Sequence, residues 1–164
     1  MFGKRFWGLV VVAVLLMVVA VPSCAIAGGM FTGTPGADLG VREGSLSGCP
    51  QTPNCISSRI SPEADSKHGI APFTYKGDRQ AAKEALLKVL SVVPRTVVVE
   101  SSEDYIRYES KSKLFGFVDD GEFYFPKDEA VIQLRSAARM GESDLGVNRT
   151  RVEQIRLAMK DLGF

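Results

Sequence analysis

Residues 115–138 read FGFVDDGEFYFPKDEAVIQLRSAA, and this stretch decides the fold. It contains two runs rich in β-branched and aromatic residues, roughly Phe115 to Phe125 and Ala130 to Ala138, which are typical of β-strands. Only Pro126-Lys127-Asp128-Glu129 separates them. Because this turn is too short for a crossover helix, the two strands are predicted to pair antiparallel.

The residues before this hairpin predict one helix and two further strands. Apolar residues recur at helical spacing from Ala82 to Val93, between a possible N-cap at Asp78 and a helix-ending Pro94. Thr96 to Glu100 and Tyr105 to Tyr108 then have the composition of strands.

A second helix is predicted at the end of the chain, from about Asn148 to Leu162, with Gly163 at its C-terminal cap. The predicted order is therefore helix, four strands, helix. Packing both helices on one face of a four-stranded antiparallel sheet would bury both apolar stripes, so we predict an α+β fold.

The N-terminus has the layout of a secretory signal. Lys4 and Arg5 precede an apolar run over 9–21, which is shorter than the roughly 20 residues of a membrane span. The sequence Val21-Pro22-Ser23-Cys24 resembles a lipobox, so we predict that Cys24 is lipidated. Cleavage after Ala27, or an uncleaved anchor, are the alternatives.

Between the signal and the predicted helices lies a glycine-rich stretch without a sustained apolar period, which we interpret as a flexible tether. The alternative is an ordered arm in which Leu39, Val41 and Leu46 pack on the domain. The predicted division is a signal peptide over 1–23, a tether over 24–48 and a single α+β domain over 49–164.

The chain has three cysteines, an odd number that needs explanation in an exported protein. If Cys24 carries a lipid, Cys49 and Cys55 remain, and an oxidising compartment favours a disulfide between them. Pro50 and Pro53 bend the short loop that this disulfide would close.

The net charge gives no support for a nucleic-acid partner, and the signal predicts a location in the cell envelope. Loss of Lys4 and Arg5 changes the net charge from +1 to −1, which gives no indication of nucleic-acid binding. The lipid would hold the protein at a membrane of the cell envelope, facing the periplasm. Ala25, where an aspartate would signal inner-membrane retention, favours the outer membrane.

An acidic cluster lies inside the first strand of the hairpin. Alternation along a strand places Asp120 and Glu122 on the same face as Val118 and Tyr124, whereas Asp119 shares a face with the phenylalanines. Charges buried in this way are costly unless they are paired.

A basic cluster follows, with Arg135 and Arg139 at the end of the last strand and Arg149, Arg151 and Arg156 in the final helix. Arg149 and Arg151 lie in the first turn of this helix, where the helix dipole disfavours cations. A negative partner is therefore expected nearby.

Three interpretations of these clusters stay open. In the first, Asp119, Asp120, Glu122 and Asp144 neutralise the arginines in a network that fixes the helix against the sheet. In the second, Arg135, Arg139 and Arg149 bind an external anion. A divalent metal on the carboxylates is the third, but the spacing forms no metal loop, and we predict no metal and no cofactor. The residues of the candidate polar network or anion site are Asp119, Asp120, Glu122, Arg135, Arg139, Asp144, Asn148, Arg149 and Arg151.

Nucleophilic catalysis has little support in the sequence. His68 is the only histidine and lies in a loop-like stretch, while Cys49 and Cys55 are expected to be oxidised. We therefore predict no catalytic residue, although an enzyme that uses Asp119, Asp120 or Glu122 is the alternative.

The chain resembles a bacterial family called domain of unknown function 1499, which also has plastid members. The stretches that carry the resemblance are Leu39-Gly40-Val41, Cys49-Pro50, Pro53 to Ser58, Phe117 to Asp120 with Glu122-Phe123, Arg135 to Gly141, Ser143 to Arg149, and Arg151, Glu153, Ile155 and Arg156. The family usually has an apolar residue at Gly121, which favours a continuous strand over a hairpin turn there. The resemblance implies this architecture and an envelope setting, and no activity.

These observations lead to one functional expectation. We expect a lipid-anchored envelope domain that acts as a non-enzymatic binding or structural module, with the membrane and either a protein or an anionic ligand as its partners.

Overall fold

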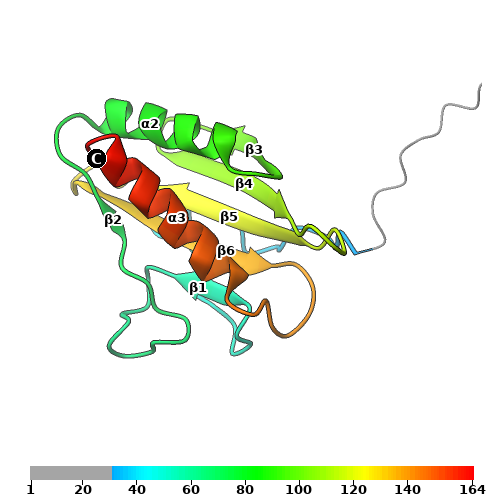
Figure 1. Ribbon diagram of the computed structural model, residues 1–164. Helices are drawn as coiled ribbons and strands as arrows, with labels where there is room; N and C mark the ends of the chain where they lie inside the picture. Colours follow the sequence, from blue (N-terminus) through cyan, green and yellow to red (C-terminus); the bar gives the residue numbers. More distant parts are fainter. Residues whose placement is uncertain (1–30) are drawn as a thin grey trace, which may run out of the picture.

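The computed structural model describes residues 31–164 and has two helices and six antiparallel strands (Figure 1). The elements are β1 (Cys55–Ser57), β2 (Phe73–Thr74), α2 (Arg79–Val92), β3 (Thr96–Ser101), β4 (Tyr105–Lys111), β5 (Val118–Tyr124), β6 (Val131–Ala138) and α3 (Val147–Asp161). The strand order across the sheet is β1-β6-β5-β4-β3, and β2 also pairs with β6. The α+β class and the antiparallel pairing are confirmed.

The prediction of four strands is wrong by two, because β1 and β2 were not recognised. These strands have three and two residues, and they pair with successive stretches along the free edge of β6. Segments this short show no alternation in the sequence. They become strands because they satisfy the backbone groups that β6 would otherwise leave unpaired.

Strand β5 lies in the middle of the sheet, and all seven of its residues are buried. It continues without interruption through Gly121, as predicted. Tyr108 of β4 is the direct partner of Gly121, and its ring occupies the space that a Cβ atom at that position would need. The glycine therefore makes room for a buried aromatic ring.

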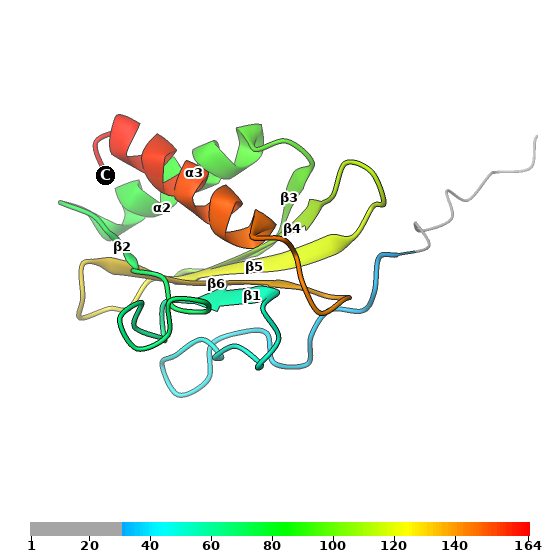
Figure 2. The same cartoon turned by 60° about the horizontal axis from the view of Figure 1, so that its bottom comes forward.

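Both helices cover the same face of the sheet, as predicted (Figure 2). Helix α2 begins after Asp78, whose carboxylate accepts a hydrogen bond from the Ala81 backbone N–H at 2.8 Å. Apolar side chains fill the space between the helices and the sheet. They include Leu86 and Leu90 of α2, Val152, Ile155 and Met159 of α3, and Ile106, Phe123, Ile132 and Leu134 of the sheet.

The opposite face of the sheet is partly covered by residues 31–48, which we call the N-terminal arm (Figure 2). Leu46 of the arm is 3% exposed and packs with Tyr105 and Tyr124. The Gly40 backbone N–H donates a hydrogen bond to a carboxylate oxygen of Glu122 at 2.7 Å.

The flexible tether predicted over 24–48 is therefore the wrong description of residues 31–48, which form the alternative, an ordered arm. The physical reason is that the sheet face beneath the arm carries buried charges, which take their partners from it. Residues 24–30 lie outside the described part of the chain.

The predicted signal and Cys24 also lie outside the described residues. Within residues 31–164, neither helix has the length and apolarity needed to cross a membrane.

Candidate functional site

The alternation predicted for β5 is confirmed, and it divides the acidic cluster between two faces of the sheet. Asp120 and Glu122 lie on the face that the N-terminal arm covers, whereas Asp119 points to the helices and pairs with Arg151 of α3. The candidate site is therefore two networks, one on each side of β5.

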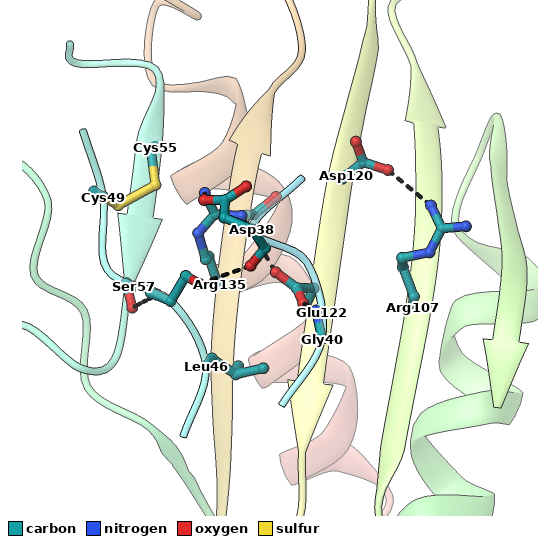
Figure 3. A network of polar contacts seen from close by, with 12 residues as sticks. Asp38, Gly40, Leu46, Cys49, Cys55, Ser57, Arg107, Asp120, Glu122 and Arg135 are labelled. Carbon is teal, nitrogen blue, oxygen red and sulfur yellow. Dashed lines mark hydrogen bonds and ion pairs between the residues drawn. A yellow bond between two sulfur atoms is a disulfide. The ribbon is translucent and has the colours of Figure 1, made fainter. Parts of the chain in front are cut away.

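Glu122 is the centre of the network beneath the arm and is fully buried. One of its carboxylate oxygens accepts hydrogen bonds from the Gly40 N–H at 2.7 Å and from the Tyr105 hydroxyl at 2.8 Å. The other accepts from Arg135 Nη1 at 3.2 Å (Figure 3). Burial raises the pKa of Glu122, and these donors partly oppose that effect.

Arg135 connects Glu122 to the arm at two points. Its Nη2 donates to Asp38 Oδ2 at 2.7 Å, and its Nε donates to the Gly48 carbonyl oxygen at 3.1 Å (Figure 3). The side chain of Arg135 is only 5% exposed, whereas that of Asp38 is 48% exposed. The buried guanidinium of Arg135 is therefore paired with one buried carboxylate, Glu122, and one partly exposed carboxylate, Asp38.

The end of the arm is fixed covalently by the disulfide between Cys49 and Cys55, whose prediction is confirmed. The two Cα atoms are 5.6 Å apart, within the usual range for a disulfide. Because Cys55 begins β1, the bond ties the arm directly to the edge of the sheet.

A second group of charges lies beside Glu122 on the same face. Asp120 accepts two hydrogen bonds from Arg139, at 2.7 and 2.8 Å, and one from Arg107 of β4 at 3.1 Å. Both arginines also pair with Glu109. Hydrogen bonding to Asp120 raises the pKa of Arg139 further above its usual value.

A cleft of about 550 Å³ lies between the arm and the sheet, and its charged lining residues are Asp38, Asp120, Arg135 and Arg139. The ion pairs of this face join three arginines to five carboxylates, so the network is not a surplus of positive charge. Its members are Arg107, Arg135, Arg139, Asp38, Glu100, Glu109, Asp120 and Glu122.

The network on the helix side fixes α3 against the sheet. Arg151 donates to Asp119 Oδ2 at 2.6 Å and to Asn148 Oδ1 at 2.9 Å, and Ser136 of β6 donates to the same Asn148 oxygen. Burial raises the pKa of Asp119. The hydroxyl of Tyr108 lies buried in this region without a hydrogen-bond partner among residues 31–164.

Asp144 does not neutralise an arginine, contrary to one interpretation of the sequence. Its two carboxylate oxygens accept from the backbone N–H groups of Gly146 and Asn148, at 3.0 and 2.8 Å. Asp144 therefore caps the start of α3, where a negative charge also suits the helix dipole.

Arg149 and Arg156 do not join the other arginines, so the basic cluster read from the sequence is not one site. Arg149 Nη2 donates to three backbone carbonyls in the loop over 66–69, at 2.9 to 3.2 Å. Arg156 donates to the carbonyls of Ala71 and Pro72 and pairs with Glu153. Backbone carbonyls are thus the negative partner of Arg149, in place of the carboxylate or external anion expected from the sequence.

The imidazole ring of His68 is buried and contacts protein groups through both of its nitrogens. Its Nδ1 lies 2.6 Å from Asp65 Oδ2 and its Nε2 lies 3.2 Å from the Thr52 carbonyl oxygen, and the residue is 7% exposed. Both ring nitrogens are therefore occupied. In residues 31–164 no group of three or more histidine, cysteine or acidic residues is arranged to hold a metal ion.

Sequence reasoning missed several members of the network beneath the arm. Arg107 and Glu109 share a face of β4 by the same alternation that was applied to β5, so their participation could have been inferred. Asp38 and Gly40 could not, since they reach Glu122 and Arg135 over more than 80 residues of sequence.

A family model with the description "Protein of unknown function (DUF1499)" matches residues 45–159. This range includes every helix and strand of the domain, apart from the last two residues of α3. No curated protein and no solved structure matches the chain.

Proposed function

The chain belongs to the DUF1499 family, whose description gives no activity, and from this premise we propose that it is a lipid-anchored cell-envelope domain with a non-enzymatic binding or structural role. The domain would face the periplasm, and the lipid on Cys24 would insert in the outer membrane. The observation that carries the non-enzymatic part is that each carboxylate of the acidic cluster is held by an arginine.

A catalytic acid or base must exchange its proton with a substrate, so it needs access. The side chains of Asp119, Asp120 and Glu122 are 8%, 4% and 0% exposed, and each accepts hydrogen bonds from a guanidinium group. Carboxylates in this arrangement position α3 and the N-terminal arm against the sheet. This supports an architectural role for them.

The enzyme alternative rests on Asp120, because it is the one member of the acidic cluster that borders the cleft. Thermal unfolding of Asp120→Asn and Glu122→Gln separates the two cases. Loss of an architectural carboxylate lowers the melting temperature. Catalytic groups are often kept at a cost in stability, so a more stable Asp120→Asn variant would favour the enzyme.

Binding of an external anion at Arg135 and Arg139 would require displacing Glu122 or Asp120 from its buried pair, which is unfavourable. Thermal melts of the parent protein with and without phosphate or sulfate test this reading, because a ligand that binds only the folded state raises the melting temperature. We expect no anion-dependent shift. A shift that disappears in Arg139→Ala would favour an anion site.

The anchoring part of the proposal rests on the lipobox-like Val21-Pro22-Ser23-Cys24 and on the pairing of the other two cysteines in a disulfide. Mass spectrometry of the mature protein, expressed in bacteria with its own N-terminus, tests it. We expect Cys24 as the acylated N-terminal residue, and no acylation in Cys24→Ser. A mature protein that begins at Gly28 would contradict the proposal. Membrane fractionation of the parent then distinguishes the outer from the inner membrane.

A further inference from the structure

One end of the sheet carries a group of exposed apolar side chains. Three segments meet there: the start of the N-terminal arm, the loop between β4 and β5, and the loop between β6 and α3 (Figures 1 and 2). We call this surface the apolar loop end, and its residues are Phe31, Leu114, Phe115, Met140, Leu145 and Val147. Leu114 and Leu145 are 83% and 93% exposed.

These side chains form one surface. Phe117 lies between Phe31 and Phe115, with ring centroids 5.1 and 6.0 Å away, which joins the arm to the β4–β5 loop. An apolar hollow of about 440 Å³ then joins that loop to Met140 and Leu145. Contiguous apolar surfaces of this kind usually mark contact with a partner or a membrane.

We propose that the apolar loop end lies on the lipid bilayer and inserts its loop side chains at the headgroup boundary; this inference rests on the proposed lipid anchor. Phe31 is the first described residue and belongs to this end. Seven residues lead back from it to Cys24, and even a fully extended chain of that length spans at most about 25 Å. A lipid on Cys24 therefore keeps this end of the domain at the membrane.

The charges beside the surface suit an anionic bilayer. Arg95, Lys111 and Lys113 border a hollow that also includes Leu114 and Phe115. Its one acidic residue, Glu109, is already paired with Arg107 and Arg139. Exposed basic residues next to apolar ones are the usual composition of a surface that binds anionic headgroups.

The acidic residues of the opposing β6–α3 loop are Glu142 and Asp144. The carboxylate of Asp144 is already engaged in capping α3. Arg95, Lys111 and Lys113 outnumber these two acidic residues, so we expect the surface to prefer anionic lipids.

Tryptophan quenching by brominated lipids tests the contact directly. The lipidated chain is reconstituted in vesicles of phosphatidylethanolamine and phosphatidylglycerol. Because it would begin at Cys24, it has lost Trp7, the one tryptophan of the sequence, together with the signal. Tryptophan is introduced by Leu114→Trp, or by Leu157→Trp as the matched control. Leu157 is 59% exposed and lies on α3, towards its C-terminal end.

We expect brominated lipid to reduce the emission of Leu114→Trp about twofold or more, because interfacial side chains enter the outer part of the acyl region. The control should keep its emission. Leu145→Glu, added to the Leu114→Trp chain, should restore most of the emission, since it places a charge in the same surface without removing a packed side chain.

Equal emission of Leu114→Trp and its control, in a chain that floats with the vesicles, would overturn the docking and leave the anchor intact. A chain that does not float would overturn both. Protein-concentration-dependent burial of Leu114→Trp without vesicles would assign the surface to a second copy of the chain and would likewise overturn the docking.

Discussion

Truncation of Glu122 is the most direct test of how the arm is held. Glu122→Ala leaves three donors without their acceptor: the Gly40 N–H, the Tyr105 hydroxyl and Nη1 of Arg135. Removing one partner of a buried ion pair costs about 3–5 kcal/mol of unfolding free energy, and each unpaired buried donor adds to the loss. Because Arg135 keeps Asp38, we expect a loss of about 3–5 kcal/mol in total.

Urea unfolding followed by circular dichroism measures this loss as a lower midpoint at an unchanged slope. Glu129→Ala is the matched control, because Glu129 is an exposed glutamate in the turn between β5 and β6 and should cost less than about 0.5 kcal/mol. Adding Arg135→Met to Glu122→Ala should recover part of the loss, since the unpaired buried charge is then removed. A loss below about 1 kcal/mol for Glu122→Ala would refute the reasoning, as it would mean that Glu122 is not a buried partner.

Three further predictions concern the same region. Gly121→Ala should cost about 1–3 kcal/mol, because the new methyl group collides with the buried ring of Tyr108; in a Tyr108→Ala background the added cost should vanish, and additive losses in thermal melts would contradict this. Replacing Cys49 and Cys55 by serine should cost about 2 kcal/mol of unfolding free energy, and equal urea midpoints for this variant and the oxidised parent would show the disulfide to be energetically neutral. Burial raises the pKa of Glu122 above its ordinary value of 4.5, so the folded state holds this proton more tightly than the unfolded state does. The melting temperature of the parent relative to Glu122→Gln should therefore fall as the pH rises from 4.5 through the folded pKa, and a constant difference would count against the raised pKa.

The parts of the fold that local chemistry specifies were predictable from the sequence. The Asp78 cap and Pro94 bound α2 within a residue or two of the prediction, and the composition of 115–138 gave the β5–β6 hairpin. Strands β1 and β2 were missed because pairing along β6, rather than their own sequence, makes them strands.

For the candidate site, too, the sequence predicted what depends on a single strand and not the contacts between distant segments. Alternation along β5 correctly assigned Asp120 and Glu122 to one face. The carbonyls that bind Arg149 and the arm residues that bind Arg135 were out of reach, because each contact joins segments that lie far apart in the sequence. The glycines of the arm predicted a flexible segment. The arm is instead held in place, in part because the Gly40 backbone N–H donates a hydrogen bond to Glu122.

Because the arm packs on the domain, the linker between an anchored Cys24 and the domain is shorter than the sequence suggests. A free tether over 24–48 could extend to about 85 Å, whereas residues 24–30 alone extend to about 25 Å. The volume that the domain could search then falls about fortyfold, and its effective concentration at the anchoring membrane rises by the same factor. For a domain held through Cys24, a ligand embedded in that membrane would be met almost continuously, and one deeper in the periplasm would be met only if it came to the surface.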